Sequence, residues 1–453
     1  MDFNSLRNKF PSFVYKDHTI DLTEEGYVLE YHFEITGLDT FKTKWIFPKG
    51  KRNIRPDDII LNEMAFNLGM VEAISYYKIS CPKTVKIECG LMNEKKDKWW
   101  KKLFYNGLGE FMYRNGIDVS SDELFDFEYE DSPEIRFDDS SSYEGYMVPV
   151  GGGKDSVVSL ELLSDDNITT YCVNKSDTVK NVIERCTHAK ADIAPKRILD
   201  KKVLEYNEKG YLNGHIPFSA VLAFSSYIAA FLNGIKYIAL SNENSANETT
   251  VKGSFVNHQY SKSYEFEEDF RSYVSSYFAS DIQYFSALRP LNESLIAMLF
   301  ASHKQYHDVF RSCNAGSKKG IWCCNCPKCL FVYIILSPYL NDDELIKIFG
   351  ENLLDKPSLE KDFRELTGID ENKPFECVGT RSEVNASLKE YIKTGRRGVL
   401  TDKYKEKILS SDDGYDLKKI LNEWCDKNAL PEEVEEKLRF AVESNKKLWE
   451  GKV

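Results

Sequence analysis

The sequence lacks any apolar stretch long enough to cross a bilayer, and it lacks an excess of basic side chains. Its longest apolar runs, such as Leu330 to Leu336, fall far short of the roughly 20 residues that a membrane-spanning helix needs. Residues 1–10 have no apolar core of a signal peptide. With 60 basic and 72 acidic side chains, the formal net charge of −12 argues against general nucleic-acid or membrane binding. We therefore expect a cytoplasmic protein with no nucleic-acid or membrane partner.

The chain also lacks internal repeats and low-complexity tracts, and its 453 residues exceed the usual size of one domain. Residues 1–144 mix alternating segments with a helical apolar stretch, which predicts an α+β amino-terminal domain. Residues 145–310 alternate strands with helices, as nucleotide-binding α/β domains do. Residues 311–340 carry a cysteine cluster, and residues 341–453 have the charged, helical periodicity of a helical carboxy-terminal region.

The α/β segment has a regular pattern of buried strands and helices. Strands are predicted at Tyr146–Val150, Ile168–Val173 and Lys236–Leu240, and helices at Asp155–Leu163 and Phe218–Leu232. Such alternation is typical of a parallel sheet with helices on both faces. The predicted fold class is therefore α/β.

A glycine-rich turn joins the first of these strands to its helix in the string Val148-Pro-Val-Gly-Gly-Gly-Lys-Asp-Ser156. Glycines let the backbone approach phosphate oxygens closely, and the amides of a helix start attract an anion. Asp155 is expected to cap the helix. The Walker spacing is absent, because Lys154 follows the glycines directly. A plain strand-to-helix connection remains the alternative interpretation.

The same string resembles the S-G-G-x-D-S loop of the PP-loop ATP pyrophosphatases, with Gly151 where that family usually has serine. Enzymes with this loop cleave ATP between the α- and β-phosphates and leave AMP on a substrate oxygen. The resemblance implies that the loop holds the pyrophosphate portion of ATP, through Gly151, Gly152, Gly153, Lys154, Asp155 and Ser156.

Eleven cysteines in a reducing compartment indicate a metal site better than disulfides. Four of them have spacings that suit a tetrahedral zinc ion: Cys313, Cys323, Cys326 and Cys329. Spacing alone does not choose between Cys323 and its neighbour Cys324, although we favour Cys323. A complete shell of four thiolates predicts a structural zinc, and an iron-sulfur cluster is the minor alternative.

Three polar strings interrupt the apolar pattern at residues 214–219, 241–248 and 257–265. The second follows a predicted strand, where open α/β sheets bind their ligands. Together with Arg289 these strings indicate a substrate site, although each residue can instead form a turn or start a helix. A structural role is as plausible as a catalytic one for the lone histidines His215 and His258.

Several strings across residues 60–340 look like those of the MurL-type epimerases, which act on UDP-N-acetylmuramoyl-alanyl-glutamate. They include Gly107-Leu-Gly-Glu-Phe111, the glycine-rich loop, Ser241-Asn-Glu243, Val256-Asn-His-Gln-Tyr-Ser-Lys-Ser263 and Trp322-Cys. The resemblance implies inversion of the terminal L-glutamate of UDP-MurNAc-L-Ala-L-Glu, with Mg²⁺ and with ATP converted to AMP and diphosphate. Candidates for the proton transfers are Glu243, His258 and His215, and candidates for substrate binding are Asn242, Asn257, Lys262 and Arg289.

Two other functions fit parts of this pattern. One is another PP-loop chemistry, either an amide- or nitrile-forming ligase or a tRNA-modifying enzyme. The acidic balance of the chain offers a tRNA-modifying enzyme no evident basic face. The other is a zinc-stabilised module that binds a nucleotide without catalysis.

Overall fold

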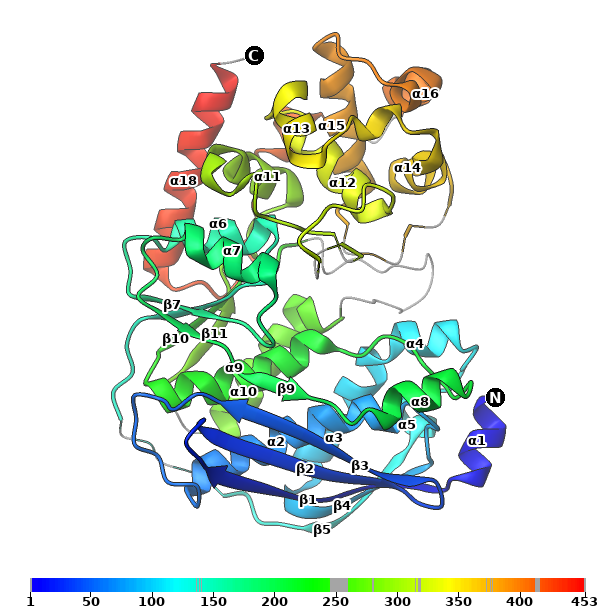
Figure 1. Ribbon diagram of the computed structural model, residues 1–453, viewed down its shortest axis with the longest axis vertical. Coiled ribbons are helices and arrows are strands. Elements are labelled where there is room, and N and C mark those ends of the chain that lie inside the picture. The colour runs from blue at the N-terminus through cyan, green and yellow to red at the C-terminus, as the bar shows by residue number, and fades with distance from the viewer. Residues whose placement is uncertain are drawn as a thin grey trace. The chain divides into compact units, whose positions relative to one another are not determined.

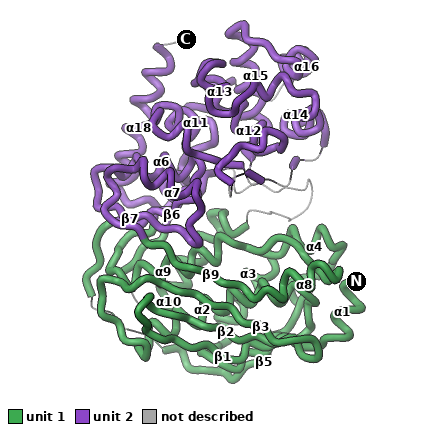
Figure 2. Tube along the Cα trace, viewed as in Figure 1, with its two compact units in different colours: residues 1–145, 193–238, 254–284 green, residues 146–192, 239–253, 285–453 purple. Residues whose placement is uncertain are grey.

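The computed structural model describes residues 2–135, 137, 139, 141–244, 260–278, 281–313, 315–316, 319–371, 373–374, 376, 378–411 and 416–451. The chain forms two compact units whose segments alternate along the sequence (Figure 2). Unit 1 comprises Met1–Gly145, Ile193–Ile238 and Ser254–Tyr284, and unit 2 comprises Tyr146–Asp192, Ala239–Gly253 and Phe285–Val453. The four-part division by sequence pattern remains a prediction.

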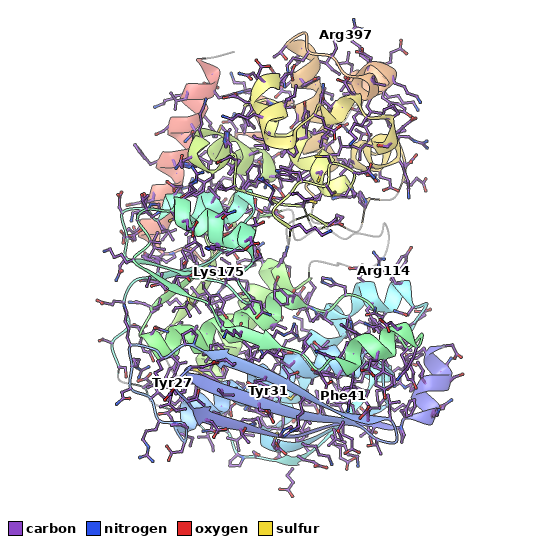
Figure 3. All side chains as sticks on the ribbon, in the orientation of Figure 1. Tyr27, Tyr31, Phe41, Arg114, Lys175 and Arg397 are labelled. Atoms are coloured by element: carbon purple, nitrogen blue, oxygen red, sulfur yellow. The ribbon has the colours of Figure 1, made fainter. Side chains whose placement is uncertain are left out.

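Unit 1 contains a six-stranded sheet in the order β5-β4-β1-β2-β3-β9. Its first three strands form an antiparallel meander, and β4 runs parallel to both β1 and β5. Strand β2 alternates buried and half-buried side chains, so its buried face supplies Tyr31 to the core, while β3 supplies Phe41 (Figure 3). The strands are β1 Ser12–Leu22, β2 Tyr27–Ile35, β3 Asp39–Phe47, β4 Thr84–Met92, β5 Asp126–Asp131 and β9 Lys196–Ile198.

Helix α2 (Ile59–Tyr77) lies at the centre of unit 1, where it packs on the sheet and on α9 (Phe218–Asn233). Its N-cap Asp58 accepts hydrogen bonds from the backbone N–H groups of Ile60 and Leu61. Both helices are apolar around most of their circumference, as expected of helices buried on more than one side. The remaining helices of this unit are α1 Phe3–Lys9, α3 Glu94–Gly107, α4 Gly109–Arg114, α5 Ser121–Leu124, α8 Lys202–Glu208, the short η2 Tyr260–Lys262 and α10 Tyr264–Tyr277.

The second sheet has five strands in the order β11-β10-β6-β7-β8, of which β7, β10 and β11 are labelled in Figure 1. Strands β6 and β7 are parallel and completely buried, and β6 is accordingly apolar, whereas β7 includes two buried threonines. Lys236 and Leu240 accept backbone hydrogen bonds from Gln283 and Ala287, so β10 and β11 advance in the same direction. The strands are β6 Tyr146–Pro149, β7 Ile168–Tyr171, β8 Ala191–Ile193, β10 Tyr237–Leu240 and β11 Gln283–Ser286.

The rest of unit 2 is mainly helical, as the sequence predicts for the carboxy-terminal region. Helix α12 (Pro327–Leu336) is fully apolar apart from its first turn and packs against α11, α14 and α15. The other helices are α6 Lys154–Leu162, α7 Asp177–Arg185, α11 Glu293–Ser302, η3 Lys304–Tyr306, α13 Asp342–Phe349, η5 Leu353–Asp355, η6 Pro357–Leu359, α14 Glu360–Thr367, α15 Arg381–Lys393, α16 Val399–Ser410, α17 Leu417–Ile420 and α18 Glu432–Glu450.

The mixed α/β class and the predicted elements of the α/β segment are confirmed, with ends that differ by one or two residues. The expectation that Asp155 caps α6 is wrong. Gly153 is the N-cap, and Asp155 lies in the first turn, because Lys154 already has helical geometry. Among the described residues, no helix is both long and apolar enough to span a membrane.

Candidate functional site

The glycine-rich loop lies between β6 and α6, and a Cβ on either of two of its glycines would come closer than 3.0 Å to a neighbouring side chain. Gly152 has a φ of +82°, and a Cβ there would come within 2.7 Å of Thr178 Cγ2. A Cβ on Gly153 would come within 2.9 Å of Ser312 Oγ. Gly151, in contrast, is exposed and has open space around it. The sequence therefore needs glycine at the second and third positions for backbone geometry and close packing.

Hydrogen bonds fix the loop against the segment that precedes the cysteine cluster. The Arg311 N–H donates to the Gly152 carbonyl at 2.8 Å, and the Lys154 N–H donates to Ser312 Oγ at 3.4 Å. Ser156 Oγ donates to the Gly153 carbonyl at 3.0 Å. Since the N-cap is glycine, it has no side chain to accept from the amides of the first turn. A helix start of this kind is suited to binding an anion.

Lys154 lies behind the loop and is enclosed by carboxylates. Its side chain is 1% exposed, and Nζ contacts both Asp155 Oδ1 and Glu293 Oε2. Burial opposes the charged form, but the two carboxylates outweigh it and raise the pKa of Lys154. The Asp155 side chain is 33% exposed, so it is the charged group of the loop that faces solvent. The lysine thus holds Asp155 and the start of α11 together.

A third carboxyl group, that of Glu383, lies next to Glu293 and is completely buried. It belongs to the capping box of α15, where its Oε2 accepts from the Thr380 N–H at 2.7 Å and from Thr380 Oγ1 at 2.8 Å. Burial and the nearby carboxylates of Glu293 and Glu243 raise the pKa of Glu383 to about 7. Sequence reasoning missed this residue. The T-x-x-E spacing predicts a helix start, but it does not indicate that Glu293, about 90 residues earlier, lies next to Glu383.

The ends of β10 and β11 bring three of the predicted substrate-site residues into unit 2. Asn242 Nδ2 donates to Ser286 Oγ at 3.1 Å, and the buried Arg289 donates to the Glu243 carbonyl at 2.7 Å. Ser241 Oγ, at the end of β10, donates to Ser159 Oγ of α6 at 2.8 Å. The segment after β10 that carries Asn242 and Glu243 is therefore hydrogen-bonded to the helix that begins at the glycine-rich loop.

Two other predicted residues lie in unit 1. His215 lies in the segment before α9, and its imidazole is 40% exposed. Its Nδ1 atom is 3.9 Å from Glu110 Oε2. Lys262 ends the short η2 helix. Lys78 Nζ donates to the Gly214 carbonyl at 2.6 Å, and desolvation lowers the pKa of Lys78 to about 8. The predicted residues Asn257 and His258 lie outside the described residues.

The four cysteines predicted as metal ligands converge, with their sulfur atoms all within 4.8 Å of one another. Cys326 Sγ and Cys323 Sγ lie 3.5 and 3.6 Å from Cys329 Sγ. Tetrahedral zinc with bonds of about 2.3 Å requires sulfur–sulfur distances of about 3.8 Å. Cys313 completes the set. The four thiols therefore fit a metal ion of the expected size.

Helix α12 positions the last two of these cysteines. Cys326 is its N-cap, and its sulfur accepts from the Cys329 N–H at 3.5 Å. The neighbouring Cys329 thiol and this backbone N–H stabilise the thiolate and lower the pKa of Cys326 to about 5. Cys324 has a φ of +50°, and its thiol donates to the Phe349 carbonyl at 3.1 Å. That turn points Cys324 away from the cluster, so Cys323 is the member of the adjacent pair that joins it.

Family profiles and individual relatives both relate this chain to the same family. The profile of the MurL N-terminal domain matches residues 4–287, and that of the MurL C-terminal domain matches residues 309–400. Among named relatives, a UDP-N-acetyl-alpha-D-muramoyl-L-alanyl-L-glutamate epimerase from Xanthomonas oryzae is 33% identical over 341 residues, 71% of this chain and 72% of its own length. Proteins of the same name from Micromonospora and Salinispora tropica are 34% and 33% identical, again over 71% of this chain. They are aligned over 73% and 71% of their own lengths.

No solved structure matches the chain significantly. The two profiles nevertheless span most of the sequence, including the glycine-rich loop and all four clustered cysteines. The chain belongs to the MurL family.

Proposed function

We propose that the protein is an ATP-dependent epimerase of the PP-loop type. It inverts the terminal L-glutamate of UDP-MurNAc-L-Ala-L-Glu to D-glutamate, for peptidoglycan precursor synthesis in the cytoplasm, and releases AMP and diphosphate. The observation that carries this proposal is the alignment with three epimerases named for this substrate, over 71% of the chain. The glycine-rich helix start inside the aligned family region supports the use of a nucleotide.

Activation of the carboxylate explains why an epimerase consumes ATP. An ionised carboxylate disfavours loss of its α-proton, because negative charge then builds beside existing negative charge. In the proposed first step a carboxylate oxygen attacks the α-phosphorus of ATP, and diphosphate leaves. The acyl-adenylate loses its α-proton to a base and receives a proton on the opposite face. Water then attacks the acyl carbon and releases AMP and the free acid.

The glycine-rich loop is the proposed site of the ATP phosphates. Backbone amides at Gly152, Gly153 and the start of α6 would donate to phosphate oxygens, with the Ser156 hydroxyl as a further donor. The partly exposed Asp155 carboxylate suits Mg²⁺, which would neutralise charge on the phosphates. Lys154 is enclosed by Asp155 and Glu293, so its proposed task is to hold Asp155 in place.

Proton transfer and substrate binding rest on residues from the polar strings. Glu243, His215 and His258 are the proposed proton-transfer groups, and each has to reach the α-carbon in the bound complex. For binding the substrate we propose a further set of polar side chains: Asn242, Asn257, Lys262 and Arg289. An arginine binds a carboxylate or diphosphate through parallel hydrogen bonds.

The four-cysteine cluster is the proposed site of a structural zinc ion. Four thiolates complete a tetrahedral shell, so a bound zinc has no open position for substrate. Its effect on activity would be indirect, through Ser312, which precedes Cys313 and accepts from the Lys154 N–H. The cluster thereby stabilises the segment that contacts the glycine-rich loop.

One incubation tests the proposed function. The purified protein is mixed with Mg-ATP and UDP-MurNAc-L-Ala-L-Glu, AMP is measured, and the glutamate released by acid hydrolysis is resolved by chirality. We expect AMP and D-glutamate to appear together. AMP without inversion would indicate another PP-loop adenylating enzyme. ATP binding without AMP would indicate a nucleotide-binding module, and either result would refute the epimerase.

A further inference from the structure

A row of charged side chains in contact with one another begins at the glycine-rich loop and continues to helix α11. Asp155, which is partly exposed, contacts Lys154, and Lys154 contacts Glu293 at the first position of α11. Lys154 and Glu293 are 139 residues apart in sequence and are both almost fully buried. A buried ammonium needs a charged partner, because desolvation without compensation is very unfavourable. Glu293 therefore fixes the lysine, and the lysine fixes Asp155.

Glu383 adds one more carboxyl group to this row of charged side chains. Its Oε1 accepts from the backbone N–H of Ser294 at 3.3 Å, so it lies against the first turn of α11, beside Glu293. The two carboxyl side chains meet over Gly379. A Cβ on that glycine would lie 2.8 Å from Glu383 Oε2 and 3.1 Å from Glu293 Cγ. The close approach of two acidic side chains in a buried site makes it unfavourable for both to be ionised.

The surrounding charges determine which carboxyl keeps a proton. Glu293 has Lys154 as a direct cationic partner, whereas Glu383 accepts only from the neutral donors of Thr380 and Ser294 among the described contacts. Burial and the neighbouring carboxylates raise the pKa of Glu383 to about 7. The ionisable groups near this pair on the adjoining elements are Lys154, Asp155, Glu243 and Tyr339, and Arg289 donates to the Glu243 carbonyl.

We propose that Glu293 is a positioning residue that holds Asp155 through Lys154, and that Glu383 carries the proton which lets Glu293 stay ionised. This inference rests on the proposed function, because the proposed function assigns Asp155 to the phosphates of ATP and their metal ion. When the pH rises through about 7, Glu383 loses its proton and repels Glu293. The hold on Lys154 and Asp155 weakens, so ATP is bound less tightly in alkaline than in mildly acidic solution.

The test compares wild type, Glu383→Gln and Glu293→Gln between pH 6 and 8.5. Glutamine at 383 keeps an oxygen acceptor but stays neutral at every pH. In wild type we expect the KM for ATP to rise by up to about tenfold across this range, the effect of one pKa unit of coupling. In Glu383→Gln the KM should stay constant at its low-pH value. Glu293→Gln should raise the KM by about 10- to 100-fold at every pH, as loss of an orienting partner commonly does.

Glu390→Gln is the matched control, because it makes the same change about two turns further along the same helix. It should retain the pH profile of wild type. A Glu383→Gln protein with the wild-type profile, or a Glu293→Gln protein with a normal KM, would overturn the proposal.

A second measurement needs no nucleotide. Urea unfolding from pH 4 to 8 should show a slope in wild type that Glu383→Gln lacks. If AMP never forms from any variant, the proposed function fails, while the unfolding slopes still test the carboxyl pair. Equal slopes in the two proteins would refute the assignment of the proton to Glu383.

Discussion

Replacement of Lys154 by methionine is the most direct test of the buried charges behind the loop. The Lys154 and Glu293 side chains are 1% and 3% exposed, so solvent does not screen their interaction. Methionine preserves most of the apolar stem and removes only the ammonium. The substitution leaves Glu293 buried without its cation, which costs about 3–5 kcal/mol in the free energy of unfolding. That is a large part of the roughly 5–15 kcal/mol that stabilises a typical domain.

A double-mutant cycle in urea, followed by circular dichroism, measures this interaction. The Lys154→Met/Glu293→Leu protein contains no buried charge from this pair. We expect it to be at least about 2 kcal/mol more stable than Lys154→Met alone, since an apolar pair can replace a buried ion pair at little loss. Lys180→Met is the control, because Lys180 pairs with Glu184 on α7 with both side chains about 60% exposed. Its effect should stay below about 0.5 kcal/mol.

The reasoning would be refuted if Lys154→Met were as mild as the control, or if the effects of the two single substitutions simply added. Either result would mean that Lys154 and Glu293 do not interact in the folded protein. Under the same conditions the far-ultraviolet spectra of all variants should match that of wild type, so that loss of stability is not confused with loss of fold.

Three further predictions concern the loop, the metal cluster and pH. Gly152→Ala should lower AMP formation by about 100-fold, because the φ of Gly152 is +82° and the new methyl group would meet Thr178. Gly151→Ala should retain activity, because Gly151 has open space around it. Cys326→Ser should lose the bound zinc, measured by atomic absorption together with a lower melting temperature, whereas Cys324→Ser should keep zinc near one ion per chain. The folded protein retains a proton on Glu383 that the unfolded chain loses, so this group's contribution to stability is full below pH 4.5 and absent above pH 7. Over that window it amounts to about 3 kcal/mol, and Glu383→Gln should lack the corresponding decrease in unfolding free energy.

Local patterns were sufficient to predict the elements on either side of the loop. Four-residue buried strands such as β6 and the apolar α9 are determined mainly by apolar runs and by glycine positions, which the sequence displays directly. The cysteine cluster was also predictable, because the C-x2-C spacing brings sulfurs together within a single turn. Spacing left open the choice between Cys323 and Cys324, which depends on the φ of +50° at Cys324.

Contacts between distant segments were not predictable from one sequence. The Lys154 ammonium contacts Glu293, and nothing near either residue in the sequence signals that pairing. Glu383 carries a recognisable capping pattern, yet its raised pKa comes from carboxylates that only the tertiary fold brings near. The assignment of Asp155 as a helix cap failed for a local reason, because the helix begins one residue earlier than its polar pattern suggests.

The interleaving of the two units has a consequence for biosynthesis. The ribosome releases β1 to β5 and α2 first, but β9 of the same sheet and α9, which covers α2, emerge only after β6, α6 and β7. The apolar face of α2 that contacts α9 therefore stays uncovered until more than 230 residues have been made. No continuous stretch of the chain contains the whole of one unit and nothing of the other. A split at any single peptide bond between residues 146 and 284 would leave each fragment without strands or helices that its own core requires.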